Sequence, residues 1–210
     1  MIDPTAVKLI IFDCDGVLVD TETLANQVLY QHLQAKGLRY SLSEMTQLFW
    51  GLSFTDMQVR AQQHFDMQFN DHFWTQVQQD TFSSFRLNLQ PNPATLELLK
   101  ALKQPYCVAS SGSHVKMTLT LTLTGLLAAF ENRRFSAEQV SRGKPAPDLF
   151  LLVANHYGVT PAQCLVIEDS PTGCEAAEAA GMQLLAYKAE ASLRFPDVIT
   201  DLRGLLNILG

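Results

Sequence analysis

The sequence predicts an α/β protein whose core is a doubly wound parallel sheet, with an all-helical domain inserted into it. Two observations predict this fold. Short, continuous apolar runs such as Cys164–Ile167 alternate with segments of helical period, which is typical of strands buried on both faces of a parallel sheet. One long stretch, residues 20–90, shows helical period alone. We therefore expect a core domain of residues 1–19 and 91–210 and a helical cap domain of residues 20–90.

Composition is that of a globular protein with an acidic surface. At 210 residues, the chain is long enough for one sizeable core or for a core with a smaller insert. The hydrophobic share is 47% and the charged share is 17%, which excludes a disordered chain. Acidic residues outnumber basic ones by 21 to 15, and no Lys/Arg-rich run occurs. This balance disfavours nucleic acid and anionic membranes as partners.

The cysteines and the N-terminus indicate a reducing compartment. The four cysteines show neither a CxxC pair nor zinc-ligand spacing, so we expect reduced, buried thiols at Cys14, Cys107, Cys164 and Cys174. The first residues, MIDPTAVK, lack the basic and apolar regions of a signal peptide. No apolar run approaches the roughly 18 residues of a membrane-spanning helix. We therefore expect a cytoplasmic protein.

The first strand is expected over residues 7–13, followed by a turn at Gly16 and a short apolar stretch at residues 17–19. From Thr21, apolar residues recur at steps of three and four, which predicts a helix that ends near Gly37. Further helices are predicted near Ser43–Phe49, Ser53–Phe65 and Asn70–Phe85, with Ser43, Ser53 and Asn70 as their N-caps.

The core resumes after Pro91 with a helix to about Lys103 and a strand at Tyr106–Ala109. Two patterns then compete over Thr118–Thr124. Strict alternation of Thr and Leu favours a strand, whereas one helical face is shared by Val115, Leu119, Leu123 and Leu126. We predict a helix, because strands and helices alternate in the surrounding chain.

The remaining elements continue the alternation. Ser170 followed by Pro171 is typical of a helix start, and Gly181 closes that helix. Strands are predicted at Phe135-Ser136, Cys164–Ile167, Met182–Tyr187 and Val198–Ile199, and helices at Pro147–Tyr157 and Leu202–Leu209.

Polar residues follow several of the predicted strands. Asp13 and Asp15 come after the first strand, and Ser110 begins a Ser-Ser-Gly-Ser segment after the second. Glu168-Asp169 follow a third strand, and Lys144 lies in a Pro-rich loop. Because the carboxyl ends of parallel strands share one edge of the sheet, we expect these side chains to converge.

A cluster of carboxylates with one Lys and hydroxyl donors suits Mg²⁺ and a phosphate group. Crowded carboxylates repel one another unless a cation joins them, and oxygen ligands without His suit Mg²⁺. The metal would also remove the repulsion between carboxylate and phosphate. Asp13 would attack phosphorus, and Asp15, two residues along, would transfer the protons. Gly16 lets the backbone pass close to the ligand.

Four segments, DCDGVLVD, VASSGS, GKPAPD and VIEDSPTG, occur in this order along the chain. Together they resemble the motifs of the haloacid dehalogenase superfamily of Mg²⁺-dependent phosphohydrolases. Within it, the chain resembles the beta-phosphoglucomutase and phosphoglycolate phosphatase branch, which has a Rossmann-like core and a helical cap. The resemblance covers nearly the whole chain. One DxD motif alone is weak, whereas four motifs in the correct order are a specific signal.

The resemblance implies a role for each matching residue. Asp13 would be the nucleophile and Asp15 the general acid and base, with the Asp15 backbone carbonyl also binding the metal. Lys144 would tie Asp13 to the phosphate. Asp169 would complete the Mg²⁺ site with Glu168, which binds the ion either directly or through water. The phosphoryl group would contact the Ser110 side chain and the backbone N–H groups of Cys14, Asp15, Ser111 and Gly112.

Departures from the pattern favour a phosphatase. Mutases of this branch carry a His where the chain has Ala25, and an Arg in the first cap loop where it has Phe54. From residue 54 to residue 90, the only Lys or Arg residues are Arg60 and Arg86. We therefore expect hydrolysis of a small phosphorylated metabolite, a sugar phosphate or a phosphorylated sugar acid such as phosphogluconate or phosphoglycolate. A sugar-phosphate mutase and a non-catalytic phosphate- or Mg²⁺-binding regulator are the alternatives.

Substrate selection is expected to lie in the cap, and four cap residues are candidates for it: Glu22, Trp50, Phe54 and Arg60. Glu22 either shapes the site or favours the dipole of its helix from the first turn. The aromatic candidates either line a pocket or form the cap core. We expect a monomer or a weak dimer.

Overall fold

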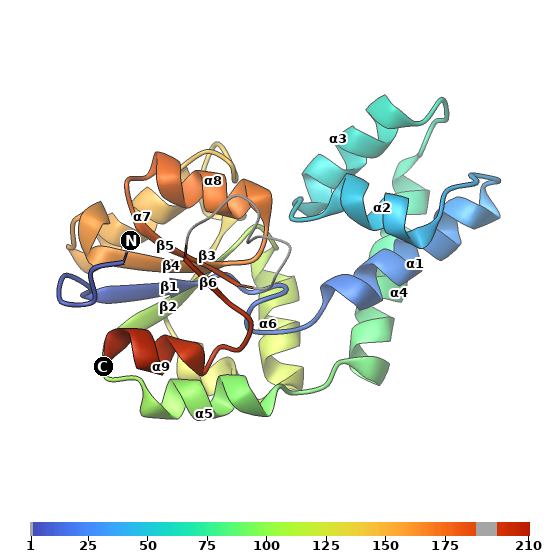
Figure 1. Ribbon diagram of the computed structural model, residues 1–210. Helices are drawn as coiled ribbons and strands as arrows, with labels where there is room; N and C mark the ends of the chain where they lie inside the picture. The colour runs from blue at the N-terminus through green and yellow to red at the C-terminus, as the bar shows by residue number, and fades with distance from the viewer. Residues whose placement is uncertain (1, 188–196) are drawn as a thin grey trace.

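The computed structural model describes residues 2–187 and 197–210 (Figure 1). Within these ranges the predicted doubly wound parallel sheet is confirmed. Its six strands lie in the order β3-β2-β1-β4-β5-β6, and all neighbouring pairs are parallel. The strands are β1 (Leu9–Phe12), β2 (Tyr106–Ser110), β3 (Arg134–Ser136), β4 (Cys164–Glu168), β5 (Gln183–Tyr187) and β6 (Val198–Ile199).

The central strand β1 has the sequence LIIF and is buried along its whole length. It pairs with β2 on one side and with β4 on the other, placing Phe12 opposite Val108 and Ile167. The strand order therefore reverses at β1. In open α/β sheets, ligands bind outside the carboxyl ends of the strands at such a reversal.

Helices cover both faces of the sheet (Figure 1). Successive side chains of β1 point to opposite faces, so Ile10 and Phe12 join one core cluster while Leu9 and Ile11 join the other. The first face is covered by α5 (Pro93–Ala101), α6 (His114–Leu123) and α9 (Gly204–Leu209), and the second by α7 (Asp148–Tyr157) and α8 (Pro171–Ala179). Short 3-10 turns are η1 (Leu127–Phe130), η2 (Ala137–Gln139) and η3 (Pro161–Gln163).

Four helices form an insertion between β1 and β2, and they lie beside the sheet (Figure 1). We call them the helical insertion: α1 (Glu22–Ala35), α2 (Leu42–Phe49), α3 (Phe54–His64) and α4 (Asp71–Asn88). They share a core of their own, which includes Leu33, Phe49, Ala61 and Trp74. Within the described chain the insertion contains no strand, as predicted. The predicted domain boundaries at residues 19/20 and 90/91 stay a prediction.

Local signals explain most of the helix starts. Ser53 and Asn70 cap α3 and α4, as predicted. The predicted N-cap of α2, Ser43, is wrong, since Ser41 caps this helix. The Ser41 side chain accepts the N–H of Glu44, and Glu44 bonds back to the Ser41 N–H.

The helix predicted over the Thr-Leu repeat is confirmed as α6. Val115 is 67% exposed, whereas Met117 and Leu121 are buried against the sheet. Thr hydroxyls fit into the helix by donating to carbonyls four residues earlier, as Thr124 does to Thr120.

Two further expectations concern the thiols and the membrane. All four cysteines are free and buried, as predicted. Within the described ranges, no helix combines the length and the apolar character that crossing a bilayer requires.

Candidate active site

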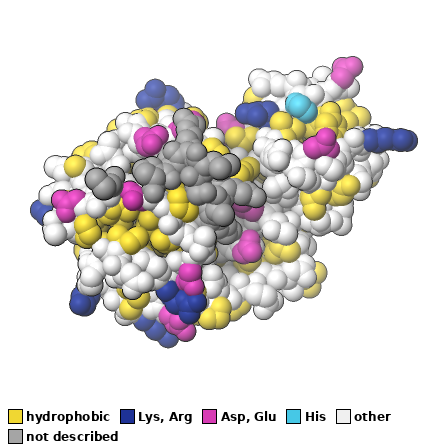
Figure 2. Space-filling model, viewed as in Figure 1, with side chains coloured by type: hydrophobic (Ala, Val, Ile, Leu, Met, Phe, Trp, Pro, Cys, Tyr) yellow, Lys and Arg dark blue, Asp and Glu magenta, His cyan; other side chains and the backbone are white. Residues whose placement is uncertain are grey.

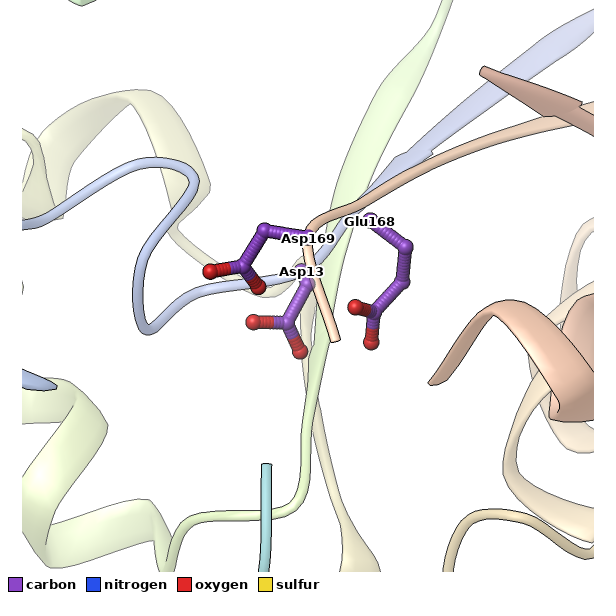
Figure 3. Close-up of side chains that lie close together, drawn as sticks. All are labelled: Asp13, Glu168 and Asp169. Atoms are coloured by element: carbon purple, nitrogen blue, oxygen red, sulfur yellow. The ribbon is translucent and has the colours of Figure 1, made fainter. Parts of the chain in front are cut away.

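Three carboxylates converge at the carboxyl ends of β1 and β4 (Figure 3). Asp13, Glu168 and Asp169 are all buried, and one oxygen atom from each lies within 4.8 Å of the others. Burial raises the pKa of the Asp13 carboxyl well above its ordinary value, although Lys144 opposes the shift. Carboxylate oxygens at this spacing could hold a hard divalent cation.

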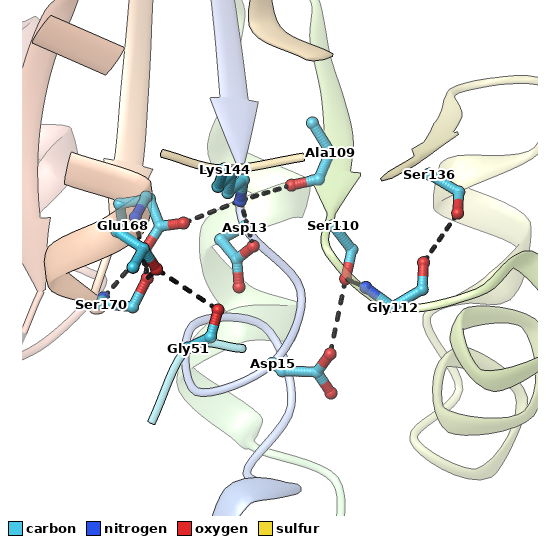
Figure 4. A network of polar contacts seen from close by, with 12 residues as sticks. Asp13, Asp15, Gly51, Ala109, Ser110, Gly112, Ser136, Lys144, Glu168 and Ser170 are labelled. Atoms are coloured by element: carbon cyan, nitrogen blue, oxygen red, sulfur yellow. Dashed lines mark hydrogen bonds and ion pairs between the residues drawn. The ribbon is translucent and has the colours of Figure 1, made fainter. Parts of the chain in front are cut away.

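Lys144 enters the cluster from the loop before α7 (Figure 4). Its Nζ atom donates to Asp13 Oδ1 at 2.6 Å, to Glu168 Oε1 at 2.7 Å and to the Ala109 carbonyl at 3.1 Å. Burial alone would lower the pKa of this ammonium, but the charges of Asp13 and Glu168 outweigh burial and raise it. Three acceptors therefore take the three protons of the ammonium group.

Glu168 is bound through both of its oxygens. Lys144 holds Oε1, while Oε2 accepts the backbone N–H of Ser170 at 2.8 Å and its hydroxyl at 3.0 Å. Gly173 packs directly against the Glu168 carboxylate: a Cβ at position 173 would lie 1.7 Å from Glu168 Oε1. The predicted Ser170 N-cap of α8 is confirmed, and the same hydroxyl accepts the Gly173 N–H. The start of α8 thus fixes the orientation of Glu168.

Asp15 lies apart from the other three carboxylates and has different partners. The Thr21 hydroxyl and Lys116 Nζ both bond to its Oδ1, the latter at 2.9 Å, and Ser110 Oγ lies 3.4 Å from its Oδ2. Burial alone would raise the pKa of Asp15, but Lys116 and these hydrogen bonds outweigh it and lower the pKa. Asp15 is therefore a carboxylate in this structure.

The serine-rich loop after β2 lies opposite Asp15 (Figure 4). Ser110 Oγ accepts the N–H of Gly112 at 3.0 Å, and the Ser136 hydroxyl donates to the Gly112 carbonyl at 2.7 Å. Ser110, Ser111 and Gly112 all line the cavity above the carboxylates. Cys14 was predicted to contribute only its backbone N–H, and its buried side chain packs in the core.

The cavity has a volume of about 560 Å³ and lies between the carboxyl edge of the sheet and the helical insertion. Of the four cap candidates, Glu22 and Phe54 line it, whereas Trp50 and Arg60 do not. The indole N–H of Trp50 is buried without a hydrogen-bond partner, and Arg60 is exposed on α3. Sequence periodicity did not distinguish these orientations.

The insertion also contacts the core directly beside the carboxylates. The Thr172 hydroxyl donates to the Gly51 carbonyl at 3.3 Å, which joins the loop after α2 to the first turn of α8 (Figure 4). Gly51 has a positive φ of 69°, and a Cβ there would lie 2.6 Å from the Ser170 Cβ. Glycine is therefore required by both the conformation and the space.

Sequence reasoning missed Lys116 and Asn26, which both line the cavity. Lys116 occupies the first turn of α6, where the helix dipole disfavours a cation. That unfavourable position is a signal that could have drawn attention to it. Asn26 is a polar residue on the apolar face of α1, which was also visible in the helical period.

Basic side chains do not form a large patch on the face that Figure 2 shows. On the face shown in Figure 2, Lys and Arg side chains are scattered singly or in small groups among acidic ones. The net charge of the chain is −6.

A Rossmann-like sheet with buried carboxylates and a Lys at its carboxyl edge defines a hydrolase class. The chain belongs to the haloacid dehalogenase-like hydrolase family, whose sequence model matches residues 7–181. This membership confirms the resemblance drawn from the four motifs.

Relatives within this family include phosphatases. A probable pseudouridine-5'-phosphatase of Drosophila melanogaster is 33% identical over 183 residues, covering 83% of this chain and 79% of the relative. A 6-phosphogluconate phosphatase of Escherichia coli is 26% identical and covers 88% of this chain and 84% of its own. A solved hydrolase of Deinococcus radiodurans, with bound phosphate and sodium, has a TM-score of 0.77 and 29% identity, covering 97% and 95% of the two chains. The prediction of a phosphatase-type enzyme is thereby confirmed.

Proposed function

We propose that the protein is a Mg²⁺-dependent phosphatase that hydrolyses a small phosphorylated metabolite, a sugar phosphate or a phosphorylated sugar acid, through an aspartyl-phosphate intermediate. The observation that carries this proposal is the buried cluster of Asp13, Glu168 and Asp169 around Lys144. Phosphatases among the relatives, and the phosphate in the Deinococcus structure, support the substrate class.

The metal would be held by Asp13 and Asp169, together with the backbone carbonyl of Asp15. All of these donors are oxygen atoms, which suits Mg²⁺. When bound, Mg²⁺ neutralises charge between the carboxylates and the phosphate and polarises the phosphoryl group. Glu168 has a different role in this proposal: its two oxygens already bind Lys144 and Ser170, so it positions the Lys.

Asp13 would act as the nucleophile. Lys144 binds Oδ1 and fixes the rotamer, leaving the second oxygen to attack phosphorus. The bond from phosphorus to the ester oxygen then breaks, and the departing oxygen takes a proton from Asp15. In the second step Asp15 takes a proton from water, whose oxygen attacks phosphorus and breaks the bond to Asp13. Inorganic phosphate leaves, and both Asp residues return to their starting states.

Asp15 must carry a proton in the first step, although its partners keep it ionised here. A phosphate dianion arriving beside the carboxylate would raise the Asp15 pKa, because like charges disfavour ionisation. Phosphate would also compete for Lys116, which now pairs with Asp15 at 2.9 Å. Substrate binding thus favours the protonated acid that the leaving group requires.

Hydrolysis is favoured over mutase activity by the cavity wall. Among the described lining residues, Lys116 is the single Lys or Arg. Ala25 and Phe54 also line the cavity, at the positions where mutases of the branch would carry His and Arg. A bisphosphate intermediate would require a second cationic subsite. We propose in addition that residues 20–90 act as a cap that excludes water from this cavity.

The proposal is tested by phosphate release from a panel of phosphorylated sugars, sugar acids and phenyl phosphate. Asp13→Asn should reduce turnover by roughly 10⁴-fold or more, because it removes the nucleophile. Asp66→Asn, an exposed change in the insertion, is the matched control. Activity should also stop in EDTA and return with Mg²⁺. Substantial turnover by the Asp13 variant would overturn the nucleophile assignment, and formation of an isomer from a hexose 1-phosphate would indicate the mutase.

A further inference from the structure

Asn26 is a buried polar side chain in the wall of the cavity. The residue is 8% exposed and belongs to the stripe Glu22, Ala25, Asn26 and Leu29, which lines the cavity at three- and four-residue steps along α1. Within the described chain, its carboxamide makes no hydrogen bond to another residue. The carboxamide lines the cavity, so its donor and its acceptor are both available to a molecule that enters the cavity.

The surroundings of Asn26 indicate the chemistry of this partner. α4 brings the neutral polar residues Gln78 and Thr81 to the cavity, and the start of α3 brings the neutral Thr55 beside the acid Asp56. Within the described residues, the helical insertion contributes no Lys or Arg to the lining, whereas it contributes the acids Glu22 and Asp56. A negatively charged group would find no cation on this wall.

A carboxamide offers both an acceptor and a donor, which matches hydroxyl groups that also do both. A carboxylate on the substrate could only accept, so it would leave the amide oxygen unsatisfied and would face the acids of the wall. A site built to bond a hydroxyl rejects analogues that lack it, because its own polar groups are then left unpaired.

We propose that Asn26 is a specificity-determining residue that binds a hydroxyl group of the leaving alcohol. This inference rests on the proposed phosphatase function and narrows its substrate to a neutral, polyhydroxylated phosphate ester. It assigns the selection to α1, the helix that directly follows the Asp15 turn in the chain.

The experiment compares kcat/KM for three substrates in each variant: sorbitol 6-phosphate, 6-phosphogluconate and phenyl phosphate. Wild type should prefer sorbitol 6-phosphate to the sugar acid. Asn26→Leu, which is similar in volume, should lower kcat/KM for sorbitol 6-phosphate by about tenfold, as expected for one lost hydrogen bond. Its kcat/KM for phenyl phosphate, which has no hydroxyl, should stay within about twofold of wild type.

Two further variants separate recognition from a structural role. Gln27→Ala changes the exposed neighbour on the same helix and should leave all three substrates unaffected. Asn26→Ser keeps a hydroxyl and should retain part of the preference. Equal losses on sorbitol 6-phosphate and phenyl phosphate, or no loss on either, would overturn the assignment of Asn26. Failure of wild type to hydrolyse phenyl phosphate would instead overturn the proposed function.

Discussion

Removing the Lys144 ammonium group tests how the buried charges of the site are balanced. Lys144→Met keeps an apolar side chain of similar length beside the Phe150 ring, which Lys144 Nζ approaches at 4.9 Å. The change deletes the bonds to Asp13, Glu168 and the Ala109 carbonyl. Two carboxylates, 5% and 1% exposed as residues, then lose their cation.

The expected loss follows from the cost of an uncompensated buried charge. Breaking a buried ion pair by removing one partner typically costs about 3–5 kcal/mol of unfolding free energy. Asp13 limits this cost because its pKa is already raised by burial and it can take up a proton. We therefore expect a loss of about 3 kcal/mol at pH 7, a large share of the roughly 5–15 kcal/mol typical of a domain.

The assay is urea unfolding of wild type and Lys144→Met, in EDTA and in Mg²⁺. Lys100→Met, on the exposed face of α5, is the matched control and should change stability by less than about 0.5 kcal/mol. Mg²⁺ at 100 times its Kd adds about 2.7 kcal/mol to any folded state that binds it. The gain at a fixed Mg²⁺ concentration should be larger in the Met variant, because its carboxylates have no other cation.

Two results would refute this reasoning. A Lys144→Met protein within about 1 kcal/mol of wild type in EDTA would show that the carboxylates do not depend on the ammonium for their burial. An equal Mg²⁺ gain in both proteins would show that the metal and the Lys do not balance the same charges.

Three further predictions concern the carboxylates and the glycines around them. Because its pKa is raised, the Asp13 carboxyl binds its proton more tightly in the folded state than in the unfolded state. Proton binding to Asp13 therefore stabilises the folded state at low pH, and this stabilisation is lost as pH rises above the ordinary pKa of 3.8. Asp13→Asn should therefore exceed wild type in stability by a margin that grows with pH in EDTA, and a margin independent of pH would contradict this. Gly51→Ala would place a Cβ 2.6 Å from the Ser170 Cβ and should lower kcat/KM by about tenfold or more. Gly37 also has a positive φ but has open space around it, so Gly37→Ala is the control and should leave activity intact. Gly173→Ala should destabilise the protein by more than about 2 kcal/mol in urea unfolding, because the new Cβ would displace Glu168 from Lys144. Ala is the better helix former, so a gain in stability would show that the close packing of Gly173 against Glu168 does not matter.

Most of the sheet was predictable from the sequence because its strands are buried on both faces. Runs such as LIIF and CLVIE carry few polar residues, and parallel order then brings Asp13, Glu168 and Asp169 to one edge. The acids of the site follow directly from this topology. Their positions depend on where strands end, and strand ends are visible in a sequence.

The lining of the cavity was less predictable because it depends on how each helix packs. The alternation of strands and helices around the Thr-Leu repeat identified α6 as a helix. The rotation of this helix about its axis, which exposes Val115 and brings Lys116 to Asp15, was not predicted. Such a rotation is set by contacts distant in sequence. The N-cap of α2, in contrast, could have been predicted from the sequence, because Ser41 and Glu44 have the Ser-x-x-Glu spacing of a capping box.

The central position of β1 has a consequence for synthesis on the ribosome. Phe12 pairs with Ile167, so the last partner of this strand is made 155 residues after it. At about 5–20 residues per second, the apolar strand waits roughly 8–30 s before its sheet can be completed. The helical insertion, with its own apolar core, is made within that interval and can fold first. The strand β1, which directly precedes Asp13, is thus synthesised early and completed late, and its apolar LIIF run lacks one of its two partner strands until β4 is made.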